Sequence, residues 1–470
     1  MKSKVVESAR EAVATVQPGA AVMVGGFAPM AAWPSTLLRA LAEHGAGGLT
    51  IIANAVGYGP YSPQVLAERG LVARFIGSFG GHTSIPTAME QQILAGEVAY
   101  EIVPQGTLVE RIRAAGAGIA GFYTPTGVGT VIQSPDKEVR EFDGRPHLFE
   151  RALPADAALL RADVADAAGN CRFDGTTRNF QPAMASAAAT VIVQAERVVA
   201  AGELDPEEVH LPGIFVDAVV RAEIPRAEIV AEELARGRDP LKDAARGAVV
   251  RGIPRDLMAL RVARMIADYR YVNLGVGAPT LVGRHLQEIG AQAALHAQNG
   301  ILGFRGLEDV EGWNPSYFDA SSLPIAPLPG AALFDSVTAF AMARGGHLDA
   351  VVLGAYEVSR RGDLANWSRP GVGAGRIGGA MDLLAGGGEV IALLEHTTRD
   401  GRPRIVEECS LPLTGRRCVS TIVTNLALIG VTADGLVLRE IAPGVSPDEV
   451  KEATGCPIAI PDDPPPMAFD

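Results

Sequence analysis

Cysteine is scarce in this chain of 470 residues, which contains four cysteines: Cys171, Cys409, Cys418 and Cys456. Four cysteines are too few for a disulfide framework in a chain of this length, and none of them has the Cys-x-x-Cys spacing that is common in structural zinc sites. We therefore expect no bound metal and a location in the reducing cytoplasm.

Long hydrophobic runs and an excess of basic residues are missing as well. No stretch reaches the roughly 20 apolar residues of a spanning helix, and the N-terminus lacks the apolar core of a signal peptide. The 54 acidic side chains outnumber the 41 basic ones, which gives a formal charge of −13. The overall charge does not suit phosphate neutralisation, and we expect neither nucleic acid nor a membrane as a partner. The nicotinamide-binding pattern GxGxxG with a later acidic residue is not cleanly present either.

What the chain does contain is the pattern of two α/β halves that begin in the same way. In each half, apolar residues at helical spacing lead into a short apolar strand, residues 22–24 and 271–274, and a glycine turn follows. Further short apolar runs lack the alternation of half-exposed strands, and therefore indicate parallel strands buried on both faces. These runs are residues 49–53, 191–193, 350–353 and 390–393.

The length of the chain predicts more than one domain, because single cores stop growing near about 250–300 residues. A polar stretch rich in Glu, Arg and Pro separates the halves, and we place the linker at its end. The predicted division is a first domain of residues 1–235, a linker of residues 236–245 and a second domain of residues 246–470. We also expect an N-terminal helix with Val5 and Val16 on its apolar face, and a proline-rich C-terminal segment lying over the surface.

Several longer sequence blocks are more specific indicators of the protein family than the glycine turns. They are residues 104–130, 166–188, 273–282, 298–306, 343–367, 376–384, 395–415 and 453–458. In this order, the blocks resemble the two halves of the family I CoA-transferases, joined in one chain as in the fused 3-oxoacid type. The resemblance covers nearly the whole chain. It implies two related open α/β domains with largely parallel sheets, an active site in the cleft between them, and a homodimer.

The resemblance also implies an activity, the transfer of CoA between an acyl-CoA and a 3-oxo or related carboxylic acid. CoA is then a substrate, and no cofactor is needed. In this family a glutamate attacks the thioester, and backbone N–H groups at glycine turns stabilise the oxyanion. The matching oxyanion and substrate-binding positions are Gly25, Gly26, Phe27, Asn54, Asn299, Gly300, Gly378 and Gly379.

Residue 298 departs from the family pattern. Residues 297–303 read Ala-Gln-Asn-Gly-Ile-Leu-Gly, so Gln298 occupies the position of the nucleophilic glutamate. A neutral amide has no anionic oxygen that could attack a thioester. The sequence therefore predicts that the glutamyl-CoA step is lost.

Three hypotheses explain this departure. The chain is a diverged member, a hydrolase, decarboxylase or C–C bond-forming or -breaking enzyme acting on an acyl-CoA or 3-oxo acid, with His82 or Glu357 as its base. Alternatively, it is an engineered Glu-to-Gln variant of a normal transferase, or a silent protein that keeps the CoA cleft. Each of these two side chains also has a non-catalytic interpretation. His82 would then be a solvated loop residue, and Glu357 would cap the end of a strand.

Overall fold

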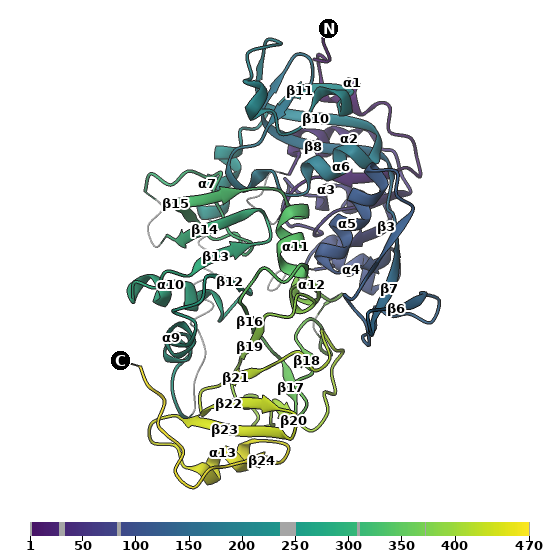
Figure 1. The fold of residues 1–470 in the computed structure, drawn as a ribbon. Coiled ribbons are helices and arrows are strands. Elements are labelled where there is room, and N and C mark those ends of the chain that lie inside the picture. Colours follow the sequence, from purple (N-terminus) through teal and green to yellow (C-terminus); the bar gives the residue numbers. More distant parts are fainter. Residues whose placement is uncertain are drawn as a thin grey trace.

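The structure is a computed structural model that describes residues 2–27, 33–81, 86–235, 251–307, 311–371 and 373–469. The described chain forms two α/β halves, each organised around one large sheet (Figure 1). His82 and the predicted linker, residues 236–245, lie outside the described residues. The predicted domain boundaries therefore stay a prediction.

The first half is built on an eight-stranded sheet with the order β11-β10-β8-β1-β2-β3-β4, to which β9 is added beside β8. Every pair along the main path is parallel, and β9 is antiparallel to β8. The strands are β1 (Ala21–Val24), β2 (Leu49–Ile52), β3 (Val72–Gly77), β4 (Ala99–Ile102), β8 (Ala155–Asp166), β9 (Cys171–Arg172), β10 (Ala188–Val199) and β11 (Ala218–Arg221).

Helices and a small antiparallel sheet complete the first half. The helices are α1 (Ala9–Val13), α2 (Ser35–His44), α3 (Gln64–Ala67), α4 (Ala88–Leu94), α5 (Gln105–Gly116), α6 (Gln181–Ala187) and α7 (Arg226–Ala235). The small sheet has the order β5-β7-β6 and consists of β5 (Gly121–Thr124), β6 (Val139–Phe142) and β7 (Arg145–Arg151).

The second half is built on a ten-stranded sheet with the order β15-β14-β13-β12-β16-β19-β21-β22-β23-β24. The five strands from β13 to β21 are parallel, and β14, β15, β22 and β23 extend the sheet in antiparallel pairs. The strands are β12 (Tyr271–Leu274), β13 (Ala294–Ala297), β14 (Ile301–Gly306), β15 (Ile325–Leu333), β16 (Ala350–Gly354), β19 (Glu389–Leu393), β21 (Thr421–Val423), β22 (Ala427–Thr432), β23 (Gly435–Ile441) and β24 (Ile458–Ala459).

The remaining elements of the second half surround this sheet. The helices are α9 (Arg255–Met265), α10 (Thr280–Glu288), α11 (Ser336–Arg344), α12 (Ala380–Leu384) and α13 (Pro447–Ala453). A small sheet is formed by β17 (Glu357–Ser359), β18 (Leu364–Ala365) and β20 (Ile405–Val406).

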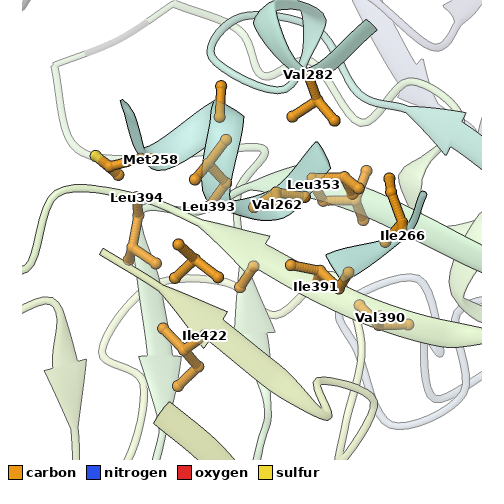
Figure 2. Close-up of a cluster of buried hydrophobic side chains, with 14 of the residues drawn as sticks. Met258, Val262, Ile266, Val282, Leu353, Val390, Ile391, Leu393, Leu394 and Ile422 are labelled. Carbon is orange, nitrogen blue, oxygen red and sulfur yellow. The ribbon is translucent and has the colours of Figure 1, made fainter. Parts of the chain in front are cut away.

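The predicted apolar runs form buried parallel strands in both halves, as expected for a sheet covered on each face. In the second half, Met258 and Val262 of α9 belong to the same buried cluster as Leu353 and Ile391 of the neighbouring strands (Figure 2). This apolar contact holds α9 against β16 and β19 of the sheet.

Two expectations about the chain ends need correction. The N-terminal helix is shorter than predicted, because Val5 pairs with Val219 in a parallel bridge and the helix begins only after Ser8, which caps it. The C-terminal segment is anchored rather than lying wholly over the surface. Met467 is 4% exposed, and its N–H donates to the main-chain oxygen of Ile441 at 2.8 Å.

Candidate active site

A cleft of about 500 Å³ lies between the two halves. The first half contributes Phe27 after β1, together with Phe79 and Gln105. The second half contributes the turns that follow β12 and β16, and the segment 376–380. The carboxyl ends of parallel strands thus meet at the cleft, which is where ligands bind in open α/β sheets.

Gln298 follows β13 at the wall of this cleft, and its residue is 6% exposed. Its Nε2 donates a hydrogen bond to Oδ1 of Asn273 at 3.1 Å. Asn273 in turn donates from Nδ2 to the main-chain oxygen of His296 at 2.9 Å and to the ring Nδ1 at 3.0 Å. No sequence motif indicated this series of contacts.

The main-chain oxygen of His296 determines how both amides are oriented. A carbonyl oxygen can only accept, so Asn273 must turn its nitrogen toward it and its oxygen toward Gln298. Gln298 must then present its nitrogen to Asn273, and its carbonyl oxygen, Oε1, is the group left for a ligand. Burial lowers the pKa of His296 to about 4, so the ring is neutral near pH 7 and Nδ1 can accept.

The glycine positions next to the cleft are required by close backbone approach. Gly300 has φ +110°, and a Cβ there would lie 2.0 Å from the main-chain oxygen of Phe334. Gly378 has φ +56°, and a Cβ would lie 2.8 Å from the ring of Phe79, which belongs to the other half. Substitution at either position would therefore displace a wall of the site.

The predicted first-half turn lies where the sequence placed it, directly after β1. The N–H of Gly25 donates to the main-chain oxygen of Leu159 at 2.9 Å, Gly26 has φ +128°, and Phe27 is 2% exposed at the cleft wall.

Gln105, which sequence analysis did not single out, joins predicted residues from both halves. Its N–H donates to the main-chain oxygen of Gly378 at 2.9 Å, and its side-chain Nε2 donates to Oδ1 of Asn54 at 2.7 Å. Gly379 lies against the same side chain and is the N-cap residue of α12. The only sequence signal was that Gln105 belongs to the conspicuous block 104–130.

Asp382 on α12 stabilises the contact between the two halves from a buried position. The residue is fully buried, and its carboxylate accepts from the N–H of Gly106 at 2.7 Å and from the hydroxyls of Thr107 and Thr126 at 3.2 Å each. Arg344 lies 3.4 Å from it. One second-half carboxylate thus holds the first turn of α5, where Gln105 lies.

Glu357 and Asn299 are not among the residues that line the cleft. The carboxylate of Glu357 accepts from the N–H groups of Ser410 and Leu411, at 2.7 and 3.1 Å, and from the Ser410 hydroxyl. The structure therefore does not bring Glu357 to Gln298, and its contacts match the role of a strand-end cap. Asn299 is buried, and its Nδ2 donates to the main-chain oxygen of Phe318 at 2.7 Å.

An arginine-rich hollow of about 910 Å³ continues from the cleft, with which it shares Arg255, Arg369, Arg404 and Glu395. Glu395 pairs with Arg255 at 2.5 Å and with Arg404 at 3.5 Å. Three more arginines line the hollow: Arg251, Arg399 and Arg402. Sequence analysis missed this group because its members come from separate segments of an acidic chain.

A second cavity of about 560 Å³ adjoins the cleft, and Leu274, Gln298 and Ala320 line both. Asp319 lies on its wall and accepts from the N–H groups of Ser321 and Leu323 at 2.8 Å each. Burial raises the pKa of Asp319 to about 6.

Two other kinds of site are absent from the described residues. No group of three or more His, Cys, Asp or Glu side chains there could hold a metal ion. In the same part of the chain, no helix has the length and apolarity needed to cross a membrane.

The chain is similar to known proteins along most of its length. A protein-family profile described as Coenzyme A transferase matches residues 6–222 and 255–453. The chain is 38% identical, over 96% of its length and 89% of the relative, to human succinyl-CoA:3-ketoacid coenzyme A transferase 2, mitochondrial. It is 41% identical to one of the subunits of 3-oxoadipate CoA-transferase from Pseudomonas putida, over 45% of this chain and 98% of that protein.

A solved structure shares the fold along almost the whole chain. The acyl-CoA transferase (YdiF) apoenzyme from Escherichia coli O157:H7 superimposes with a TM-score of 0.79 and 22% identity, covering 99% of this chain and 96% of that chain. The expected architecture of α/β halves with largely parallel sheets is therefore confirmed.

Proposed function

Because this chain belongs to the coenzyme A transferase family, we propose that its cleft binds a CoA thioester and a 3-oxo or related carboxylic acid. The names of the relatives with 38% and 41% identity refer to 3-ketoacid and 3-oxoadipate transferases, which supports this substrate class. Phe27 of the first-half turn and Gly378 and Gly379 of the second half line the cleft, so main chain from both halves lies next to the proposed thioester.

The arginine-rich hollow supports the place of CoA. Guanidinium groups bind phosphate oxygens in bidentate pairs, and CoA carries several phosphate charges. Arg399 and Arg402 line the hollow beside the cleft in a chain whose net charge is −13. We propose that the nucleotide end of CoA lies there and that the thioester reaches Gln298.

The side chain of Gln298 determines which chemistry the cleft can perform on the thioester. Its Nε2 is engaged by Asn273, and the remaining carbonyl oxygen can accept a hydrogen bond but is not a nucleophile at neutral pH. We propose that the protein processes the thioester without a covalent intermediate on residue 298. The hydrogen bond between Gln298 and Asn273 shows that the surrounding residues accommodate the amide. This favours a naturally diverged protein over an engineered Glu-to-Gln variant of a normal transferase.

The test of CoA binding uses isothermal calorimetry with free CoA. The double variant Arg399→Ala/Arg402→Ala is expected to bind CoA at least about tenfold more weakly, and wild-type affinity is expected to fall with added salt. Arg10→Ala, which removes an exposed arginine of α1, is the matched control and is expected to bind as wild type does. Absence of CoA binding to the wild-type protein would contradict the proposed function.

We further propose that the protein is a homodimer of the cytoplasm. The family resemblance supports the dimer, and the four cysteines, all free, fit a reducing compartment. Light scattering at micromolar concentration tests the dimer, and a monomer mass would contradict it. Fractionation of the source cells tests the location.

A further inference from the structure

The second cavity is placed to receive the acyl part of a thioester. A thioester carbonyl has two arms, one leading to CoA and the other to the acyl chain. If the cleft and the arginine-rich hollow hold the CoA arm, as the proposed function requires, the acyl arm must leave the carbonyl in another direction. Gln298 lines both spaces, so the second cavity is open to that arm. Its volume of about 560 Å³ is ample for a small-molecule substituent.

The walls of this cavity are largely apolar. β13 contributes Leu295, β14 contributes Phe304, the segment before β15 contributes Leu323, and β15 contributes its first residue, Ile325. Such a lining favours the methylene part of an acyl chain, because burying each CH₂ contributes about 0.8 kcal/mol.

The charged side chains of the cavity differ in how they are engaged. Arg284 pairs with Asp256 and lies 3.5 Å from Glu288. Asp319 accepts two backbone N–H groups. Arg305 is exposed on β14, and no acidic side chain in the described part of the chain pairs with it. It is therefore the cationic group of this cavity that is available to an anionic ligand.

We propose that the cavity receives an acyl chain that is apolar along its length and ends in a carboxylate, which pairs with Arg305. The bond would be a charge-assisted one from the guanidinium to a carboxylate. Arg305 lies four positions after Ile301, which adjoins the 298–300 turn, and the two Cα atoms are at most about 13 Å apart along β14. The fitting acyl groups are therefore dicarboxylic and longer than succinyl.

The test compares two CoA thioesters of equal chain length, adipyl-CoA and hexanoyl-CoA, by calorimetry at one ionic strength. Wild-type protein is expected to bind adipyl-CoA about fivefold to tenfold more tightly than hexanoyl-CoA. The preference for succinyl-CoA over butyryl-CoA is expected to be smaller than this. The preference for suberyl-CoA over octanoyl-CoA is expected to be at least as large.

Variants assign the preference to the cavity. Arg305→Gln is expected to abolish the preference for adipyl-CoA while leaving the affinities for hexanoyl-CoA and free CoA unchanged. Arg305→Lys is expected to keep part of it. Leu323→Trp, which fills the cavity, is expected to weaken both thioesters and to spare free CoA.

The outcomes separate this inference from the function on which it rests. Equal affinity for adipyl-CoA and hexanoyl-CoA, or a preference that survives Arg305→Gln, would overturn the inference while CoA binding stands. Failure of the wild-type protein to bind free CoA would overturn both.

Discussion

Gln298 donates its side-chain N–H to Oδ1 of Asn273 across 3.1 Å, and both residues are almost completely buried. The orientation of Asn273 is imposed by the main-chain oxygen of His296, which lies 2.9 Å from Nδ2. The environment of residue 298 is therefore complementary to a hydrogen-bond donor. An amide or a neutral carboxylic acid can donate a hydrogen bond to Oδ1 of Asn273. A carboxylate cannot donate, and its oxygen would face the Asn273 oxygen without a hydrogen atom between them.

The substitution Gln298→Glu tests this complementarity through stability. Burial and the facing oxygen of Asn273 should raise the pKa of the new carboxyl above its usual value near 4.3. A group with a raised folded-state pKa favours folding when protonated, and this contribution is lost as the pH rises. We expect the variant to be less stable than wild type by about 1–2 kcal/mol at pH 8, with a smaller deficit at pH 5. Thermal unfolding at both pH values measures this.

Gln287→Glu is the control for that experiment, because Gln287 is exposed on α10. It should show little change at either pH. A Gln298→Glu protein as stable at pH 8 as at pH 5, relative to wild type, would show that the site accepts a carboxylate freely.

Asp382 should be among the most sensitive positions of the junction between the halves. Asp382→Ala leaves the N–H of Gly106 and two threonine hydroxyls without their acceptor in a fully buried place. We expect a loss of about 3–5 kcal/mol, together with weaker ligand binding because Gln105 begins the helix concerned. Denaturant unfolding checks this, with Asp434→Ala, an exposed aspartate, as control. A loss below about 1 kcal/mol would be inconsistent with the network.

His396 gives the protein a predictable sensitivity to acid. Its ring lies between the hydroxyls of Thr424 and Thr454, at 2.9 Å each, and burial lowers its pKa to about 4. A lowered pKa means that the unfolded chain binds the proton more tightly, so stability is full above about pH 6.5 and is lost as the pH falls toward 4. The loss is at most about 3 kcal/mol.

His396→Gln should flatten this part of the profile of melting temperature against pH, because an amide does not titrate in this range. It should also lower the melting temperature at pH 8, where the imidazole fits best. An unchanged slope between pH 6.5 and 4 would show that other groups cause the acid sensitivity.

Asp319 should act in the opposite direction. With its pKa raised to about 6, the folded state holds the proton more tightly than the unfolded chain does, so its contribution to stability is lost as the pH rises from about 4 to 6. Asp319→Asn keeps an acceptor for the two N–H groups and carries no charge. We expect it to be more stable than wild type at pH 8 by about 1–2 kcal/mol, discounted for partial exposure. Near pH 4 the two proteins should melt alike.

Much of the fold could be predicted, because parallel strands covered on both faces have uniformly apolar sequences. Residues 22–24 and 350–353 are examples, and both form central strands. Local patterns failed where a distant partner decided the structure. Val5 has helical periodicity but completes a sheet edge with Val219, which lies more than 200 residues away.

The site was predictable to the extent that a motif carried it. Phe27, Gln298, Gly378 and Gly379 line the cleft, and their roles there stay predictions. Glu357 comes after the apolar strand, as the sequence indicates, but its carboxylate contacts Ser410. Sequence spacing does not say toward which side a strand end points. The orientation of Asn273 and the grouping of arginines around the hollow depend on tertiary contacts, which no local pattern encodes.

The central claim is that residue 298 forms no covalent intermediate, and intact-protein mass spectrometry after incubation with an acyl-CoA tests it most directly. Borohydride or hydroxylamine treatment, followed by peptide mapping, would locate any modification, with Gln298→Glu run beside the wild type as the variant able to form a glutamyl thioester. We predict an unmodified peptide at position 298 of the wild-type chain, while the CoA thioester still binds. A CoA-derived adduct on Gln298 itself would contradict it.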